Sequence, residues 1–460
     1  MKTLKSFVAA GIACAVITGF SASPTLARQV QLDVAPMRSV LKSGEKQTTW
    51  IRVGLDGFRM DSSSSRPAAN VAIVLDRSGS MQGEKIRRAR EAAIDALQLL
   101  GPNDIVSIIT YDSTVNVLVP ATKLTDHASV IAAVSKITAS GNTALFAGVS
   151  KGAAEIRKFL DKERVNRVVL LSDGLANVGP SAPGELGALG ASLLKENISV
   201  TTLGLGLGYN EDLMVQLAGQ SGGNHYFVEE VSELADIFRR EFDDVLSVVA
   251  QELEITVDIP ESVRPVRVLG NTADINGQQV VSRLASIYSG QNRHIVIQLE
   301  VPDSDRNSEL ILGTVTVSYT NMKTGQTDRL SGSTKIRFSD SQHAVGASLN
   351  RKVLADVVAL VSSERNKLAT KYLDEGNLLM CRQTLLENTA YLQTNSALIP
   401  SDSRLKELAR FNRRQADQLE GVNSKSDRRA RAVRKGSRFY QNAVDQQQAI
   451  AVPGSGKSGD

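Results

Sequence analysis

Two patterns of hydrophobic and polar residues divide the chain. Apolar residues occupy alternate positions in segments of 29–58 and again of 250–340, which is the spacing of β-strands with one buried face. The alternating runs include Val30-Leu32-Val34, Ile51-Val53-Leu55, Leu253-Ile255-Val257-Ile259 and Val315-Val317-Tyr319. Such alternation is typical of antiparallel sheets. We therefore predict an antiparallel β-domain over residues 249–340, against which strands in residues 28–66 pack.

The middle of the chain, residues 67–248, has continuous apolar runs instead. The runs "VAIVLD" and "RVVLLSD" are each separated from the next run by an amphipathic segment. After the first run, apolar residues recur with helical spacing at Ile86, Ala89, Ala93 and Leu97. Strands that are apolar throughout belong to a sheet covered on both faces. We predict a doubly wound, mostly parallel α/β domain, inserted in or beside the β-domain.

The C-terminal part of the chain divides into a helical and a basic region. Residues 341–424 show helical spacing and few β-branched residues, so they predict a helical region. The stretch 425–438 carries seven basic residues against one acid. This composition predicts a basic, disordered tail over 425–460, with possible weak contact of 425–438 with anionic surfaces.

The N-terminus predicts export. Residues 1–27 have two early lysines, an apolar stretch and small residues before the expected cleavage, which is typical of a secretory signal peptide. Cys14 leaves open a lipoprotein signal, and an uncleaved anchor is a further alternative. Without the signal, Cys381 is the one remaining cysteine, so no internal disulfide can form. We expect a bacterial periplasmic or extracellular protein, with Cys381 as a buried apolar residue.

Composition limits the classes of partner. The chain has 460 residues and a formal net charge of +4. That length predicts more than one domain. The small net charge gives no support for nucleic-acid binding, and we expect none.

Polar side chains gather where buried strands of the α/β domain are predicted to end. The run "VAIVLDRSGSM" places Asp76, Ser78 and Ser80 at such an end. Thr143 precedes a predicted helix, and Asp173 directly follows another buried strand. Loops at the carboxyl edge of a doubly wound sheet form its ligand site. Oxygen ligands suit hard cations, so these residues predict a site for Mg²⁺ or Mn²⁺, with Ca²⁺ less favoured.

Asp76-x-Ser78-x-Ser80, Thr143 and Asp173 together resemble the metal-ion-dependent adhesion site of von Willebrand factor type A (VWA) domains. The resemblance covers about residues 70–247 and implies a Rossmann-like fold. The wider order of segments looks like exported bacterial VWA proteins and, more distantly, inter-alpha-trypsin inhibitor heavy chains. The resemblance implies that the three hydroxyls ligate the metal directly or through one water, while both carboxylates hold coordinating waters. It also implies a protein partner whose Asp or Glu completes the coordination.

Other interpretations of these residues remain. Ser and Asp residues before helices can simply cap them. A metal-dependent, phosphatase-like hydrolase could use Asp76 as nucleophile, but the acid expected two residues later is replaced by Ser78. A motor-linked chelatase or chaperone subunit is a third alternative, but its motor partners need ATP, and export to the cell envelope argues against it. We therefore predict a non-enzymatic, exported module that captures a protein partner for adhesion or scaffolding in the cell envelope.

Overall fold

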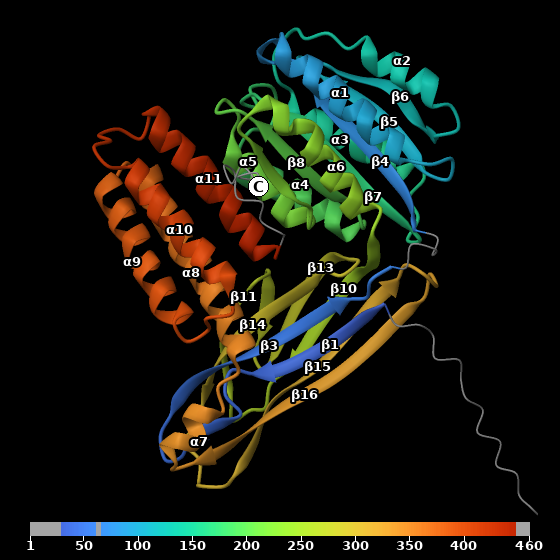
Figure 1. The fold of residues 1–460 in the computed structure, drawn as a ribbon. Coiled ribbons are helices and arrows are strands. Elements are labelled where there is room, and N and C mark those ends of the chain that lie inside the picture. Colours follow the sequence, from blue (N-terminus) through green and yellow to red (C-terminus); the bar gives the residue numbers. More distant parts are fainter. Residues whose placement is uncertain (1–28, 61–65, 448–460) are drawn as a thin grey trace, which may run out of the picture.

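The computed structural model describes residues 29–60 and 66–447, which form three parts (Figure 1). An α/β domain lies at one end, a long β-sandwich at the other, and a helical bundle packs beside both (Figure 1). The predicted signal segment 1–27 with Cys14 lies outside the described residues, as do residues 61–65 of the linker and 448–460 of the tail. None of the helices in the described ranges is both long and apolar enough to cross a bilayer.

The α/β domain is built on a six-stranded sheet of order β6-β5-β4-β7-β8-β9. The strands are β4 (Ala68–Asp76), β5 (Ile105–Tyr111), β6 (Val115–Lys123), β7 (Arg164–Ser172), β8 (Ser199–Leu205) and β9 (His225–Val228). All neighbours are parallel except β5 and β6, which pair antiparallel at one edge. The predicted doubly wound, mostly parallel α/β fold is confirmed.

Helices cover both faces of this sheet. They are α1 (Glu84–Leu99), α2 (His127–Ser135), α3 (Leu145–Arg157), α4 (Pro183–Lys195), α5 (Glu211–Ser221) and α6 (Leu234–Val245). Alternate residues of β4 serve the two faces: Val71 and Ile73 pack in one core with α1, α2 and α6, while Ala72 and Val74 pack in the other with α3, α4 and α5. Since both faces of the sheet are buried, its strands can present polar side chains to a partner at the loops where they end.

The β-sandwich consists of two sheets, ordered β1-β3-β14-β11 and β12-β13-β10-β15-β16-β2. Its N-terminal strands are β1 (Val30–Pro36), β2 (Val40–Lys42) and β3 (Gln47–Gly57). The later strands are β10 (Val248–Asp258), β11 (Arg264–Leu269), β12 (Ala273–Asn276), β13 (Gln279–Tyr288), β14 (Asn292–Val301), β15 (Glu309–Asn321) and β16 (Thr327–Ser339). Because β3 pairs with β14 and β2 with β16, the α/β domain lies between two parts of one sandwich.

The helical region contains α7 (Gln342–Ala347), α8 (Arg351–Asp374), α9 (Leu378–Ser396), α10 (Ser403–Gln418) and α11 (Arg428–Asp445). A buried ion pair joins α8 to the sandwich, with Arg52 Nε 2.6 Å from Asp356 Oδ2. Cys381 on α9 is buried, as expected, and burial raises the pKa of its thiol to about 12.

The prediction of a disordered tail from residue 425 is wrong for residues 428–445, which form α11. This helix lies between the bundle and the α/β domain (Figure 1). Its apolar residues recur at Ala430, Val433 and Tyr440 and are buried against the bundle. The high charge of this stretch predicts disorder, although its apolar residues have helical spacing.

Three cations of α11 are paired with acids of its neighbours. Lys435 is 2% exposed, and its Nζ lies 2.6 Å from Glu211 Oε2 on α5. Arg434 and Arg438 both contact Asp212 on α5 and Asp374 on α8. These three cations therefore fasten the bundle to the α/β domain. Arg428, Arg429 and Arg431 of the same helix are exposed, so contact of the basic stretch with anionic surfaces stays a prediction.

Two buried histidines should make the fold less stable in mild acid. His225 accepts or donates hydrogen bonds with Thr202 Oγ1 at 2.8 Å and Tyr209 OH at 3.4 Å. Burial lowers the pKa of His225 to about 3, and that of His294 likewise. A lowered folded pKa means that the histidine contributes its full stability above its ordinary value of 6.5 and loses it as pH falls toward 3.

We therefore expect the free energy of unfolding, measured with urea, to fall as pH drops below 6.5, by up to about 1.4 kcal/mol per pH unit per histidine. His225→Gln should reduce the slope of unfolding free energy against pH by the contribution of one proton, up to about 1.4 kcal/mol per pH unit. His343→Gln, at an exposed position of α7, should leave the slope unchanged. Identical slopes in wild type and His225→Gln would contradict this assignment.

Candidate functional site

The candidate site lies at the carboxyl edge of the α/β sheet, in the loop that follows β4. The backbone N–H of Arg77 donates to the carbonyl of Tyr111 at the end of β5, at 2.9 Å. The N–H of Gly79 donates to the carbonyl of Gly141 at 2.9 Å. These two bonds fix the β4 loop against its neighbours, so the side chains of Asp76, Ser78 and Ser80 are held at the edge.

The loop after β4 is closed by hydrogen bonds between its own polar groups. Asp76 Oδ1 accepts a hydrogen bond from the Ser78 N–H at 2.8 Å, and the hydroxyls of Ser78 and Ser80 lie 3.0 Å apart. Asp76 and Ser78 are buried, whereas Ser80 is exposed. The loop therefore presents its oxygens in a row that leads from the interior to solvent.

The loop after β7 supplies the second carboxylate. Ser80 Oγ donates to Asp173 Oδ1 at 2.6 Å, so the two loops meet directly. One residue earlier, Ser172 Oγ donates to Asp76 Oδ2 at 2.6 Å. Both oxygens of Asp76 are thus engaged in holding the two loops together, which suits an indirect role toward a ligand.

Thr143 comes from the loop before α3 and completes the set. Its backbone N–H donates to Asn177 Oδ1 at 2.8 Å, which ties that loop to the loop after β7. Between them, Gly174 leaves a small space: a Cβ there would lie 3.1 Å from Thr143 Oγ1 and 3.4 Å from Ser80 Oγ. The structure therefore brings all five predicted site residues into one cluster.

The electrostatics of the cluster favour a cation. Burial raises the pKa of Asp76 above its ordinary value, hydrogen bonds from Ser172 and Ser78 oppose that shift, and the nearby charge of Asp173 adds to it. A positive charge at the site would offset both the burial and the repulsion between the two carboxylates.

A lysine that the sequence analysis missed already contacts this cluster. Lys85, in the first turn of α1, forms an ion pair with Asp173 Oδ2, and its Nζ lies 3.3 Å from the carbonyl oxygen of Ser80. Its ammonium therefore neutralises one of the two carboxylates. The only sequence signal was its place, seven residues after Ser78 and near the start of the helix that follows.

The donor set fits a hard divalent cation. It contains two carboxylates and three hydroxyls, all oxygen donors, which are the ligands that Mg²⁺ and Mn²⁺ take. Within the described ranges, no three His, Cys, Asp or Glu side chains gather in a way that could hold a metal ion. A metal here would therefore depend on the hydroxyls of Ser78, Ser80 and Thr143.

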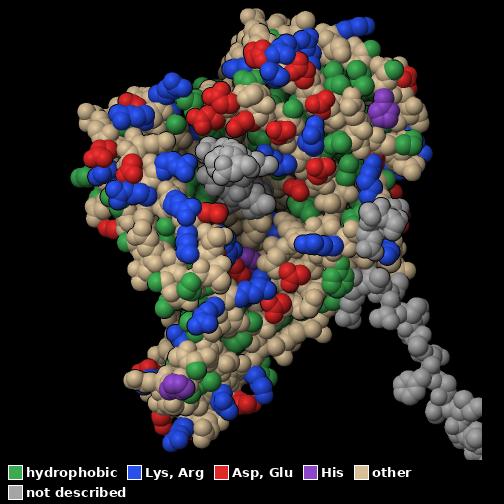
Figure 2. Space-filling view, viewed as in Figure 1, with side chains coloured by type: hydrophobic (Ala, Val, Ile, Leu, Met, Phe, Trp, Pro, Cys, Tyr) green, Lys and Arg blue, Asp and Glu red, His purple; other side chains and the backbone are tan. Residues whose placement is uncertain are grey.

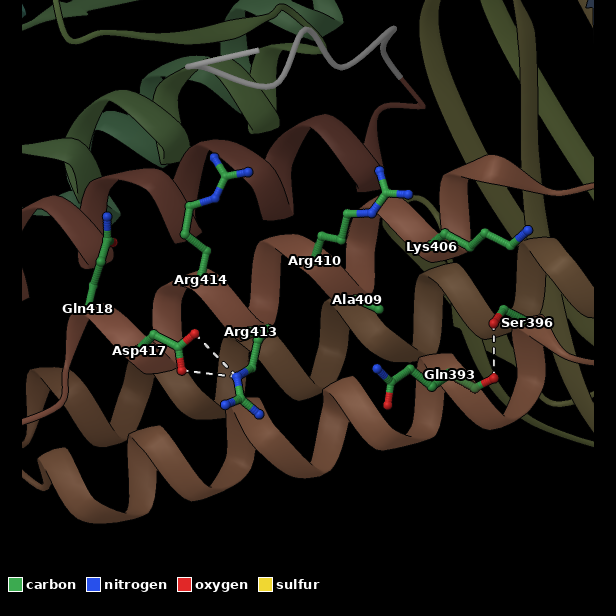
Figure 3. A pocket seen from close by; sticks show the side chains of 9 residues that line it. All are labelled: Gln393, Ser396, Lys406, Ala409, Arg410, Arg413, Arg414, Asp417 and Gln418. Atoms are coloured by element: carbon green, nitrogen blue, oxygen red, sulfur yellow. Dashed lines mark hydrogen bonds and ion pairs between the residues drawn. The ribbon is translucent and has the colours of Figure 1, made fainter.

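Other surfaces offer less specific chemistry. On the face shown in Figure 2, Lys and Arg side chains are interspersed with Asp and Glu side chains. A groove of about 800 Å³ along α9 and α10 is more basic, with Lys406, Arg410, Arg413 and Arg414 in its lining (Figure 3). In that groove Arg413 is paired with Asp417 at 3.0 Å. The groove is an open helix face without a built ligand site.

Comparisons with known proteins identify the family of the α/β domain. Residues 70–240 match the model of the von Willebrand factor type A domain, and these residues form such a domain. The chain is similar to a von Willebrand factor type A protein from Catenulispora acidiphila, with a TM-score of 0.70, 14% identity and coverage of 92% of this chain and 97% of that one. It is also similar to the VWA2 paralog of ArnB from Sulfolobus acidocaldarius, with a TM-score of 0.59, 16% identity and coverage of 91% and 98%.

Sequence relatives extend the similarity. An uncharacterized protein of Synechocystis sp. is 25% identical over 76% of this chain and 87% of its own length. The mouse inter-alpha-trypsin inhibitor heavy chain 4 is 30% identical over 40% of this chain. The chain covers 21% of that heavy chain, and 37% of the relative YfbK of Escherichia coli. The resemblance to VWA proteins and to these heavy chains is thereby confirmed.

The ammonium of Lys85 predicts an effect on cation affinity. A divalent cation at the cluster would be repelled by this ammonium, and charge pairs near a protein surface interact by about 1 kcal/mol or more. We expect Lys85→Gln to bind Mn²⁺ several-fold more tightly than wild type in calorimetry. Lys151→Gln, a change at an exposed lysine of α3, serves as the matched control and should leave the affinity unchanged. Weaker binding in Lys85→Gln would show that Lys85 instead positions Asp173.

Proposed function

We propose that this protein captures a protein partner through a divalent cation, Mg²⁺ or Mn²⁺, held by the five-residue cluster, and that the partner supplies an Asp or Glu to that cation. The observation that supports the proposal is the convergence of oxygen side chains from three loops. These residues are Asp76, Ser78, Ser80, Thr143 and Asp173.

In this proposal the neutral and the charged residues of the cluster have different roles toward the cation. The neutral hydroxyls of Ser78, Ser80 and Thr143 hold the cation directly or through one water. Asp76 and Asp173 act through coordinating waters, which is consistent with the engagement of both Asp76 oxygens by Ser78 and Ser172. When bound, the cation supplies positive charge that the hydroxyls do not compensate, and an outside carboxylate can balance it.

The surface around the cluster supports binding by a protein. Leu175, two residues after Asp173, is 59% exposed on the loop that follows β7. An exposed leucine beside a polar site offers apolar contact that a protein partner can bury. We propose that the partner places an apolar side chain on Leu175 while its acidic residue reaches the cation.

We also propose that the protein acts outside the cytoplasm, as an adhesion or scaffolding component of a bacterial envelope. The support comes from the signal-like residues 1–27 and from the single cysteine that remains after them. Fractionation of cells that express the full chain, with N-terminal sequencing of the product, tests this part. Intact Met1 in a cytoplasmic product would contradict it.

The first expected outcome concerns the metal. Wild type should bind Mn²⁺ with 1:1 stoichiometry in calorimetry or water-proton relaxation. Asp76→Ala should bind little, because it removes a carboxylate that orients the β4 loop and offsets the cation's charge. Asp126→Ala, a change to the exposed cap of α2, is the matched control and should bind as wild type does. Equal binding in wild type and Asp76→Ala would overturn the metal assignment.

The second expected outcome concerns capture. Partner retention from an envelope extract should be lost on chelation and in the double variant Ser78→Ala, Ser80→Ala, since loss of one side of a buried charged contact costs about 2–5 kcal/mol. The melting temperature without metal should change little, because apolar strands, not this loop, form the core. Leu175→Ser should weaken capture and leave Mn²⁺ binding intact.

Capture that is indifferent to chelator would contradict this proposal. Mg²⁺-dependent turnover of a phosphate ester, abolished by Asp76→Asn, would favour the hydrolase alternative instead.

A further inference from the structure

A second cavity lies where the three parts of the molecule meet, away from the metal cluster. Its volume is about 300 Å³, at the small end of the range for ligand sites. Helices α4 and α5 of the α/β domain form one wall, and β12 and β13 of the sandwich form the other. Arg293 of β14 and Gln446, just after α11, also line it.

Apolar residues from both domains form part of the walls of this junction cavity, beside polar ones. Ala191 and Leu194 line it from α4, and Leu284 and Ala285 line it from β13. At one side the α/β domain touches the sandwich through Gly222, where a Cβ would lie only 2.5 Å from the Ala285 Cβ. The φ of Gly222 is +70°, so a glycine is favoured at this close approach. The cavity is therefore preformed by the packing of the two domains.

A buried arginine lies in this apolar setting with little to balance its charge. Arg293 is 7% exposed, and its Nη2 donates to Gln446 Oε1 at 2.9 Å. Its Nε is buried without a hydrogen-bond partner, and no ion pair joins Arg293 to an acid among residues 29–60 and 66–447. Burial lowers the pKa of the Arg293 guanidinium to about 10, with only Tyr288 acting in the opposite direction.

Such an arginine differs from the other buried arginines of the chain. Arg52 pairs with Asp356 and Arg167 with Glu241, so their charges are compensated inside the protein. A buried charge without a partner is strongly unfavourable, and native proteins pair such groups with an opposite charge. The guanidinium fork presents parallel N–H donors, the geometry that a carboxylate accepts in two hydrogen bonds.

From these observations we propose that the junction cavity binds a small organic carboxylate, whose carboxylate group pairs with Arg293 and whose apolar body fills the space between α4 and β13. The site is separate from the metal cluster and does not depend on the proposed capture function. Two further cations, Lys195 and Arg283, line the cavity together with one acid, Asp274. Arg283 is already paired with Glu254 at 2.7 Å, so Arg293 is the cation that the proposal depends on.

The test uses matched pairs of probes on the full chain. Hexanoate and benzoate carry the carboxylate and an apolar body, while hexanamide and benzamide have the same shape without charge. We expect at least one carboxylate to raise the melting temperature and to bind in calorimetry with a Kd of about 1 mM or tighter. Equal responses to carboxylate and amide, or no response to either acid at about ten times that concentration, would overturn the proposal.

Variants separate a ligand site from a structural arginine. Arg293→Met should abolish carboxylate binding, a loss of about thirtyfold or more, yet melt no lower than unliganded wild type, because it removes an uncompensated buried charge. Arg283→Gln, the matched control at the same cavity, should bind within about twofold of wild type. Retained binding in Arg293→Met, or its failure to fold, would contradict the proposal.

A second variant keeps the test independent of Arg293. Ala191→Phe fills the cavity from α4 and should abolish carboxylate binding while the guanidinium remains. Unchanged binding in Ala191→Phe would place the carboxylate elsewhere and overturn the proposal. A response that appears only in a chain ending at residue 447 would show that the chain's own C-terminal segment fills the cavity, and would equally overturn an outside ligand.

Discussion

Burial of both faces of the six-stranded α/β sheet is the constraint on which the candidate metal site depends. Helices cover the two faces, so polar side chains can collect only where the strands end. Parallel strands end at the same edge, and this brings together Asp76 at the end of β4 and Asp173 after β7: Ser80 of the β4 loop donates to Asp173, and Ser172 of β7 donates to Asp76. The sheet thus brings together residues that are 97 positions apart in sequence.

Charge compensation then connects the three parts of the molecule. Arg52 and Asp356 join the sandwich to α8, and Lys435 and Glu211 join α11 to the α/β domain. Each pair is buried, so removal of one partner would leave an uncompensated charge in the interior. The parts are therefore held in one arrangement by pairing as well as by apolar contact, which is what allows a cavity at their junction to have fixed walls.

The strands and the candidate metal site could be predicted from the sequence where their cause is local. The alternation of Val30, Leu32 and Val34 and the continuous run before Asp76 reflect the periodicities of strands with one or two buried faces. The five site residues were predictable because each lies at the end of a recognisable element. Their meeting in space follows from the parallel order of the strands.

The features that the sequence did not reveal depend on contacts between distant segments. Lys85 lies near Ser80 in sequence, but its role becomes visible only through its contact with Asp173. Helix α11 was missed because Arg434 and Arg438 appear as free charge until the acids Glu211, Asp212 and Asp374 are placed opposite them. Arg293 lies in an ordinary strand pattern, and nothing local indicates that it would be buried without an acid.

The insertion of the α/β domain has a mechanical consequence. Helix α6 ends at Val245 and β10 begins at Val248, so two residues join the domain to the sandwich at that point. Strand β10 is hydrogen-bonded on both sides, to β13 and to β15. A tensile load applied through this connection would therefore enter a central strand along its length. Rows of hydrogen bonds on both flanks would share that load in shear, whereas an edge strand would have a row on one flank only.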